Sequence, residues 1–328
     1  MPAPMTRRHT ATAALGLAAA LVLAACGNPS DGGTVEVGSA QGAGTKINLS
    51  PDQRRITTGK VDSIAAGVPE EIRRRGTLEI VGSSGSSAPL TFYANDNKTI
   101  IGVEPDLAHL VAQVLGLKPR INTVSWENIF VGLDSGRYDV GFSNITDTEE
   151  RKEKYDFASY REDNLGFEAK KGSGLKVTGP RDVAGRTVAV GSGTNQEKLL
   201  IEWSKEAVRA GLKPVDIKYY QNDSDTYLAL QSGRIDLYLG PHPTAAYHAA
   251  STGKTEVVGT YSGAGATLQG LIAATTKKDS GLVKPLAAAL NEVIRNGTYA
   301  KVLARWGLTD EAVSRSEVNP PGLPRTNK

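Results

Sequence analysis

The chain has 328 residues, 39% of them hydrophobic, and carries a formal net charge of +3 at pH 7. This length exceeds what one small hydrophobic core needs and favours two domains of moderate size. The charges are nearly balanced and include no basic run interleaved with aromatic residues, so we expect no nucleic-acid partner. A single cysteine excludes an internal disulfide bond.

The first 25 residues have the pattern of a targeting segment. Arg7 and Arg8 precede an apolar, alanine-rich stretch that is too short to favour a permanent membrane span. The stretch ends in Leu-Ala-Ala-Cys at residues 23–26, which resembles the lipobox of bacterial lipoproteins. We predict a lipoprotein signal peptide over residues 1–25, an acylated Cys26 and a protein held on the extracytoplasmic face of the cell membrane. An ordinary secretory signal with a chance cysteine is the alternative.

Residues 26–71 are rich in Gly, Ser, Asn, Asp and Thr and show little apolar periodicity. This composition predicts a flexible tether between the lipid and the folded part. A short helix or strand remains open near residues 61–72. Residues 313–328 are expected to form a C-terminal tail.

Between these ends, strand-like and helix-like segments alternate, which predicts an α/β fold with crossover helices. Pro105 and Gly116 suit the start and the end of a helix whose apolar residues repeat at helical spacing. The predicted strands lie at residues 77–81, 120–124, 186–190, 217–220 and 268–274, and the predicted helices at about 105–115, 196–210 and 282–293.

A segment near the middle of the chain recurs in the second half. Leu133–Val140 reads LDSGRYDV, and Leu230–Leu237 reads LQSGRIDL. Each copy ends a short predicted helix that begins after a serine, Ser125 or Ser224, and contains a glycine that can stop the helix in the left-handed conformation. The copies are too far apart for a solenoid repeat, so we predict two similar lobes with one helix–glycine–strand unit each.

Several stretches match, in order and in spacing, the usual sequence of one protein family. They are Gly76–Ile80, Ile101–Leu107, Ser125–Val140, Thr148–Arg151, Asp156–Phe157, Asp182–Val190, Asn296–Thr298 and Trp306–Gly307. Together they resemble the bacterial extracellular solute-binding proteins of family 3, the amino-acid-binding group. The resemblance runs from about residue 74 to residue 308, which is nearly the whole folded part.

The resemblance implies an α/β fold of the type II periplasmic-binding-protein class. Each of its two lobes has a central mixed sheet flanked by helices, and two crossovers form the hinge. The implied first lobe covers residues 72–164 and 269–312, and the second covers residues 168–263. The cleft between such lobes closes around a ligand.

The resemblance also implies a function. The chain is expected to capture a small carboxylate-bearing solute, an amino acid or a derivative, and to deliver it to an ABC importer made of a permease and its ATPase. We expect a monomer that is not an enzyme, with no catalytic residues, no cofactor and no metal site.

Four residues of the first lobe take ligand-binding positions of the family. Arg151 occupies the carboxylate-binding position, where the planar guanidinium matches the two carboxylate oxygens. Thr146 and Asn144 take the positions of polar cleft contacts. Trp126 takes the position of the aromatic residue that packs on the side chain of the ligand.

The second lobe and two loops complete the expected site. Thr194 and Asn195 match a loop that leads into a helix N-terminus, which favours an anion. Ser84, Ser87 and His242 are further expected contacts.

Most of these residues also have an ordinary structural explanation. Arg151 lies in a charge-rich run that could begin a solvated helix, and Trp126 could belong to the core. Asn144 and Thr146 could be turn residues. Asn195 could cap the helix that follows it.

Two positions depart from the family pattern. Pro241 stands where the amino-acid binders usually have the aspartate that holds the ammonium group of the ligand, and proline offers no side-chain acceptor. The loop at residues 82–89 lacks the acidic and aromatic residues that are frequent there. We therefore predict a ligand that lacks a free α-ammonium group, or binds it through carbonyls, serine hydroxyls or a neighbour such as Asp223 or Asp225.

Two other functions remain open on the same fold. The chain could be an extracytoplasmic sensor subunit that acts through a partner. It could also be a dehydratase-like enzyme, with His242 as an acid or base. Metal capture is not expected, because His242 and His248 are out of helical register for joint ligation and Cys26 is lipidated.

Overall fold

The computed structural model describes residues 34–37, 45–84, 88–220 and 222–325. Its strands are β1 (Thr34–Val37), β2 (Thr45–Asn48), β3 (Thr77–Ser83), β4 (Phe92–Tyr93), β5 (Ile100–Ile101), β6 (Lys118–Val124), β7 (Val140–Gly141), β8 (Tyr155–Lys170), β9 (Thr187–Val190), β10 (Asp216–Tyr219), β11 (Leu237–Pro241), β12 (Thr255–Ser262) and β13 (Gly270–Lys277). Its α-helices are α1 (Asp62–Ala65), α2 (Glu70–Arg75), α3 (Val103–Val114), α4 (Trp126–Asp134), α5 (Pro180–Val183), α6 (Asn195–Arg209), α7 (Asp223–Gln231), α8 (His242–Thr252), α9 (Val283–Arg295) and α10 (Thr298–Arg305).

Nine of the described strands form one mixed sheet. Their order is β10-β9-β11-β8-β13-β7-β3-β6, and β12 also pairs with β8. β3 lies parallel to β6 and β7, and β9 lies parallel to β10 and β11. β8 is antiparallel to β11, β12 and β13. Two parallel groups of strands are therefore joined by a long antiparallel centre, as the predicted mixed α/β fold requires.

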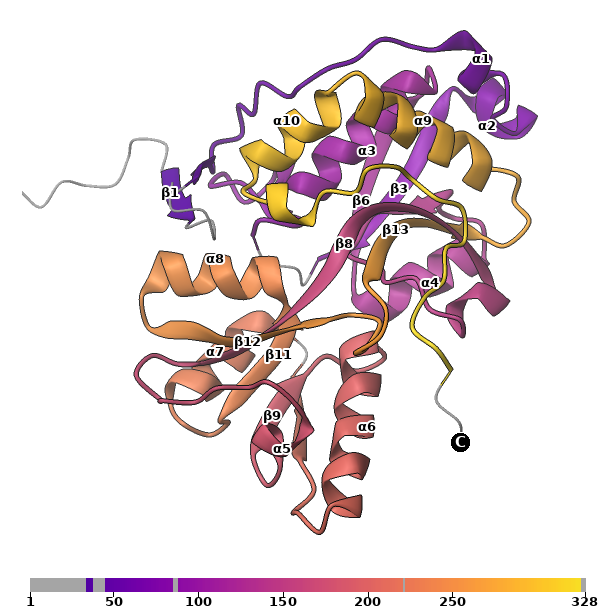
Figure 1. The fold of residues 1–328 in the computed structure, drawn as a ribbon. Coiled ribbons are helices and arrows are strands. Elements are labelled where there is room, and N and C mark those ends of the chain that lie inside the picture. Colours follow the sequence, from indigo (N-terminus) through magenta and orange to yellow (C-terminus); the bar gives the residue numbers. More distant parts are fainter. Residues whose placement is uncertain (1–33, 38–44, 85–87, 221, 326–328) are drawn as a thin grey trace, which may run out of the picture. The chain divides into compact units, whose positions relative to one another are not determined.

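β8 is the strand that the two groups share. Its first part, residues 155–163, pairs with β13, and its second part, residues 164–170, pairs with β12. In Figure 1, β8 runs from the upper group of elements down into the lower group. The chain returns between the end of β12 and the start of β13, so two crossings connect the two groups.

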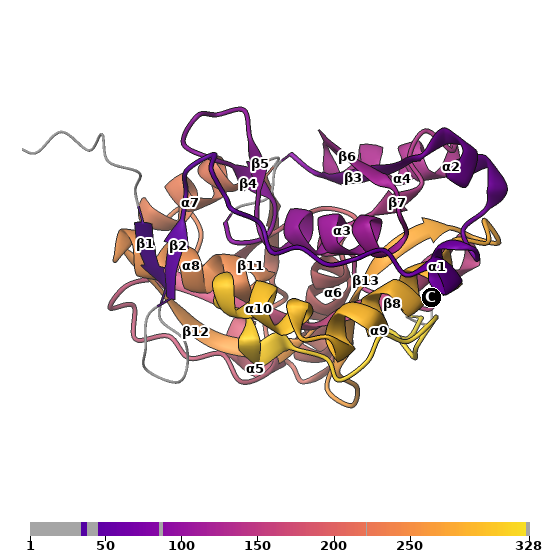
Figure 2. The same cartoon turned by 90° about the horizontal axis from the view of Figure 1, so that it is seen from above.

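Each group of strands has its own hydrophobic core. The larger core includes Leu107 of α3, Leu290 of α9 and Trp306, all essentially inaccessible to solvent. Figure 2 shows α3, α9 and α10 running close together over this part. A separate core packs Leu200 of α6 against Leu239 of β11. These two clusters, one on each side of the crossing, are the largest of the described hydrophobic clusters and are the physical basis of the two lobes.

The segment expected to be a flexible tether is packed against the first lobe from residue 46 onward. Ile47 is fully buried in the larger core, and Val68 lies there too. Arg55 forms an ion pair of 2.9 Å with Asp106 at the start of α3. The expectation was wrong for this part because isolated apolar residues in a polar stretch show no periodicity, yet each can fill a hollow of a neighbouring core. Cys26 and the predicted signal peptide lie outside the described residues.

The helix–glycine–strand units lie at equivalent places in the two lobes. Gly136 follows α4 with φ 73° and Gly233 follows α7 with φ 75°, the left-handed conformation that the repeated sequence predicts. Ser125 is the N-cap of α4, as expected. The N-cap of α7 is Asn222 rather than Ser224, because the Asn222 side chain accepts a hydrogen bond from the Asp225 N–H.

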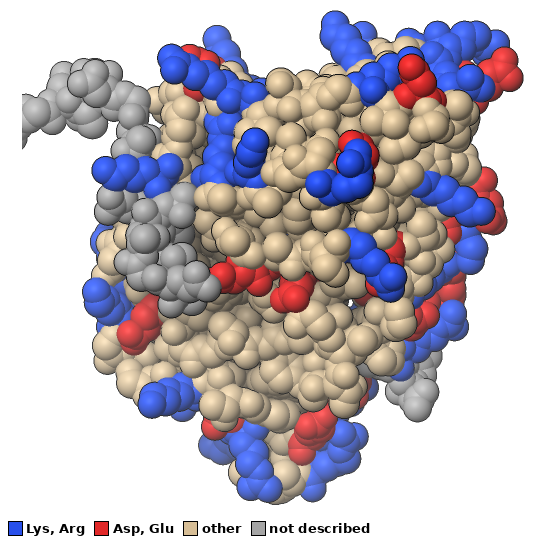
Figure 3. Space-filling view, turned by 45° about the horizontal axis from the view of Figure 1, so that its top comes forward, with Lys and Arg blue, Asp and Glu red and all other residues tan. Residues whose placement is uncertain are grey.

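The surface carries charges of both signs. On the face that Figure 3 shows, Lys and Arg side chains stand beside Asp and Glu side chains, and uncharged surface separates these groups. No helix in the described ranges combines the length and the apolar character that crossing a bilayer demands.

Candidate ligand-binding site

A cavity of about 230 Å³ lies where the two parallel groups of strands end. On the first-lobe side, its lining includes Ser84 after β3, Trp126 after β6 and Asn144 after β7. On the second-lobe side, it includes Ser192 after β9 and Tyr220 after β10. Ligands of α/β sheets commonly bind at the carboxyl ends of parallel strands. The sheet topology thus brings these residues together from distant parts of the sequence.

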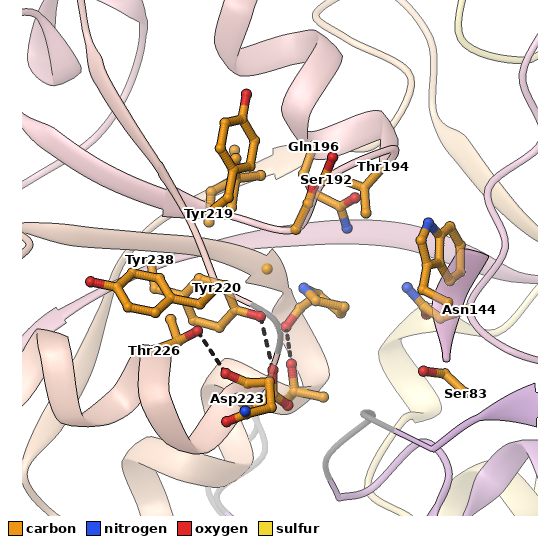
Figure 4. A pocket seen from close by; sticks show the side chains of 18 of the residues that line it. Ser83, Asn144, Ser192, Thr194, Gln196, Tyr219, Tyr220, Asp223, Thr226 and Tyr238 are labelled. Carbon is orange, nitrogen blue, oxygen red and sulfur yellow. Dashed lines mark hydrogen bonds between the residues drawn. The ribbon is translucent and has the colours of Figure 1, made fainter. Parts of the chain in front are cut away.

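The cavity wall is polar and aromatic. Figure 4 shows Asp223, Tyr238 and Thr226 together on one side, and Ser83 and Asn144 on the other. The polar groups can orient a small hydrophilic solute, and the rings can pack against its side chain.

The predicted site residues divide into three groups. Those that line the cavity are Ser84, Trp126, Asn144, Thr194 and Asn195. Those that do not line it are Arg151, Thr146 and His242. Ser87 falls outside the described residues. Contact of any of these residues with a ligand stays a prediction.

Arg151 lies just behind the cavity wall. Its guanidinium carbon is 5.4 Å from the ring centroids of both Trp126 and Phe130. Its Nη1 donates to the Thr146 carbonyl (2.8 Å), and its Nη2 donates to the Gly193 carbonyl of the second lobe (3.2 Å). Burial lowers the pKa of Arg151 to about 10, so the group remains charged at neutral pH. These two bonds use two of the five N–H donors of the guanidinium, and the other three stay available to a carboxylate.

Thr146 and Asn195 both direct their side chains at Asp163 of β8. Thr146 Oγ1 donates to Asp163 Oδ2 (2.7 Å), and Asn195 Nδ2 donates to the same oxygen (2.9 Å). Asp163 is only 1% exposed, and its burial raises the pKa of the carboxyl group. Thr146 belongs to the first lobe and Asn195 to α6 of the second, so this carboxylate joins the lobes at the crossing.

Helix α6 begins at Asn195, one residue earlier than it would if Asn195 were its N-cap. The Thr194 hydroxyl accepts a hydrogen bond from the Glu197 N–H (3.2 Å), which makes Thr194 the N-cap of α6. Asn195 is therefore not the cap. Its amide is engaged instead with Asp163 and with the Gly263 carbonyl (3.0 Å).

Asn144 is held by buried charged groups. Its backbone has a positive φ of 49°, and its side-chain oxygen accepts a hydrogen bond from Arg161. Arg161 in turn pairs with Glu311, whose pKa burial raises to about 7 against the opposing effect of Arg161. This network fixes the position of Asn144 at the cavity edge.

His242 begins α8, directly after Pro241. Pro241 lines the cavity, but His242 does not. Burial lowers the pKa of His242, with nearby Asp310 opposing the shift. His242, which was predicted as a ligand contact, therefore lies next to the cavity lining but is not part of it.

Three tyrosines that were not predicted as site residues also line the cavity, Tyr219, Tyr220 and Tyr238. A usable signal existed for two of them. Tyr219 and Tyr220 stand at the end of a predicted parallel strand, the edge at which ligands bind. Tyr238 lies inside β11, and its direction follows only from the register that pairs it with Ala189 and Glu168.

Comparison with known proteins identifies the class to which this fold and cavity belong. The family described as "Bacterial extracellular solute-binding proteins, family 3" matches residues 80–309. The chain belongs to this family.

Particular relatives agree with this assignment. The L-cystine-binding protein TcyJ of Escherichia coli K12 is 31% identical over 241 residues, which cover 73% of this chain and 86% of that protein. The arginine-binding protein ArgT of Corynebacterium glutamicum is 29% identical over 267 residues, which cover 81% and 85%.

Among solved structures, an ancestral arginine-binding protein bound to arginine is 30% identical, with a TM-score of 0.61. The match covers 71% of this chain and 98% of that one. The ancestral amino-acid-binding protein AncCDT-1, described as a precursor of cyclohexadienyl dehydratase, is 28% identical with a TM-score of 0.60, and covers 72% and 97%.

Proposed function

We propose that this chain binds an amino acid in the cavity between its lobes and delivers it to an ABC importer from the extracytoplasmic side of a membrane. The observation that carries the proposal is the cavity of about 230 Å³ at the carboxyl ends of two sets of parallel strands. Its volume suits a single small solute, and its polar lining suits a hydrophilic one. The L-cystine-binding and arginine-binding relatives support an amino acid as that solute.

Arg151 is the group that we assign to the carboxylate of the amino acid. It is charged, lies directly behind Trp126, and already donates to a carbonyl of the opposite lobe. A carboxylate that replaced the Gly193 carbonyl would give the guanidinium a charge-assisted bond. The ligand would then connect the first lobe to the loop before α6, which favours the closed arrangement.

Binding rather than catalysis is the role that we assign to the cavity. This assignment rests on the relatives, which are described as L-cystine-binding and arginine-binding proteins. The histidine that the sequence offered as an acid or base, His242, does not line the cavity.

Thermal unfolding of the full chain tests the proposal. Each of the twenty common amino acids, L-cystine, and decarboxylated analogues such as agmatine would be added at about 100 μM, which is about a hundred times a Kd of about 1 μM. A ligand that binds only the folded state then adds about 2.7 kcal/mol to the free energy of unfolding. Stabilisation by one or a few amino acids supports the proposal. Stabilisation by none of them contradicts it.

Lipid anchoring at Cys26 is a separate part of the proposal. It rests on the Leu-Ala-Ala-Cys sequence at residues 23–26 and on Cys26 being the only cysteine of the chain. Replacement of Cys26 by Ala should move the expressed protein from the membrane fraction to the soluble fraction. Mass spectrometry of the wild-type protein is the decisive measurement, and an unmodified Cys26 would refute a lipid at this residue.

A further inference from the structure

The cavity lining has a marked imbalance of charge. Among the described lining residues, Asp223 and Glu127 are acidic, and none is lysine, arginine or histidine. The two carboxylates come from opposite sides, Glu127 from α4 and Asp223 from α7. Positive charge lies next to the first-lobe side of the lining, where Arg151 lies 5.4 Å from the Trp126 ring and Arg161 donates to Asn144. A solute that enters this space therefore meets negative charge on its second-lobe side.

Asp223 has the geometry of a fixed acceptor. It is half-buried as the first residue of α7, where the helix dipole stabilises a negative charge. The Tyr238 hydroxyl donates to Asp223 Oδ1 at 3.3 Å. Burial and the adjacent Asp223 charge hold the pKa of Tyr238 well above its usual value, so this hydroxyl keeps its proton and acts as a donor. Figure 4 shows Tyr238 and Asp223 side by side.

The surroundings of Asp223 also suit a cation. Tyr219, Tyr220 and Tyr238 line the same second-lobe side, and the faces of aromatic rings attract ammonium and guanidinium groups. Pro241, which lines the cavity nearby, has no side-chain acceptor. Pro241 thus removes an acceptor from the position where amino-acid binders usually have an aspartate, and Asp223 on α7 supplies a carboxylate to the same cavity.

Asp225 is a natural comparison for Asp223. It lies in the same first turn of α7, but it is exposed and does not line the cavity. Its Oδ2 accepts a hydrogen bond from Asn222 (2.9 Å), and its own N–H donates to Asn222 Oδ1 (2.9 Å). The helix-dipole effect is common to both residues, whereas only Asp223 faces the cavity.

We infer that Asp223, positioned by Tyr238, is the specificity-determining residue that binds a cationic nitrogen group of the ligand, an ammonium or a guanidinium. The inference rests on the proposed function, because it assumes that the cavity is the ligand site. A cationic group that enters the cavity would form a charge-assisted hydrogen bond with this carboxylate, which the Tyr238 hydroxyl holds in place.

Isothermal titration calorimetry on the full chain tests the inference. The probes are the amino acid that stabilises the chain most, its Nα-acetyl derivative, and agmatine. Asp223→Asn should weaken binding of the best amino acid by about 30-fold or more. Asp225→Asn should bind within about twofold of the wild type, since it removes the same charge from the same helix turn. Tyr238→Phe should weaken binding about tenfold, because one bond to Asp223 is lost.

The probes separate the two sources of positive charge. If the Nα-acetyl derivative loses binding in the wild type and Asp223→Asn adds no further loss with it, the α-ammonium group binds Asp223. If the derivative still binds and still depends on Asp223, a side-chain cation does so.

Equal affinity of Asp223→Asn and the wild type for the best amino acid would overturn the inference and leave the proposed function intact. Binding of agmatine that depends on Asp223, with no amino acid bound, would overturn the proposed function and support the inference. No binding of any probe to the wild type overturns both.

Discussion

The hydroxyl of Thr146 donates a hydrogen bond of 2.7 Å to Asp163, a carboxylate that is almost completely shielded from water at the crossing between the lobes. Thr146→Val keeps the shape of the side chain and removes this donor. We expect the free energy of unfolding to fall by about 1–3 kcal/mol, because a buried acceptor loses a partner. Urea unfolding followed by circular dichroism measures this change. Exposed Thr57→Val should change it by less than about 0.5 kcal/mol. Equal stability of the two variants would mean that the Asp163 bond contributes nothing.

The stability of the chain should depend on pH through Asp147. Its carboxylate is buried, with Lys152 Nζ 3.4 Å from Oδ1, and burial raises the pKa from 3.8 to about 7 against the opposing effect of Lys152. The folded state then holds this proton more tightly than the unfolded state does. The free energy of unfolding should therefore fall as the pH rises from about 4 to about 7, by roughly 4 kcal/mol at most.

Asp147→Asn isolates this contribution. The amide does not titrate, so the variant should gain stability relative to the wild type as the pH rises through the same window. Urea unfolding of both proteins at pH 4, 5.5, 7 and 8 measures the difference. Asp310→Asn, at an exposed site, is the control. A constant difference between Asp147→Asn and the wild type at all four values would show that Asp147 titrates alike in both states.

Arg151→Lys tests whether the shape of the cation matters. A lysine keeps the charge but cannot donate two parallel bonds to a carboxylate. We expect the Kd for the best amino acid to rise at least about tenfold, and Arg151→Ala to lose about 2–5 kcal/mol of binding free energy. Titration calorimetry provides both values. Lys154→Ala, an exposed cation of the same segment, should bind as the wild type does. Unchanged binding by Arg151→Ala would remove this residue from the site.

Gly263 allows the second crossing to approach the first. A Cβ at this position would lie 1.7 Å from Asp163 Oδ2. Gly263→Ala should therefore displace the Asp163 carboxylate and lower the free energy of unfolding by about 1–3 kcal/mol. Gly179→Ala is the matched control, because a Cβ there meets nothing within 4 Å. Equal midpoints of thermal unfolding for the two variants would contradict the close approach.

The sequence predicted most elements because their signals are local. The apolar residues of α3 recur at helical spacing, and the Gly136 and Gly233 positions each stop a helix. The packing of residues 46–71 could not be predicted in this way, because Ile47 is buried by contacts with a distant part of the chain. The start of α7 was misplaced because Asn222 and Ser224 are both good caps, and only the backbone geometry chooses between them.

Several residues that line the cavity could be predicted from the sequence, but the directions of their side chains could not. Resemblance to a family placed Trp126 and Asn144 at the cavity, because strand order brings matching positions together. It could not reveal that the Thr146 side chain turns toward Asp163, nor that the Arg151 nitrogens donate to Thr146 and Gly193. These directions depend on rotamers and on the crossing of the lobes, which no local pattern encodes.

The shared strand β8 has a consequence for the order of folding. The second core is built from a continuous stretch of chain between residues 165 and 261, so it can form as soon as that stretch is available. The first core needs Ile272 and Ala274 of β13, and α9 and α10 beyond them, to pack against residues from much nearer the N-terminus. Contacts of such long sequence separation form slowly. During synthesis, which begins at the N-terminus, the second lobe should therefore fold first. The first lobe can fold only after β13, α9 and α10 have been synthesised.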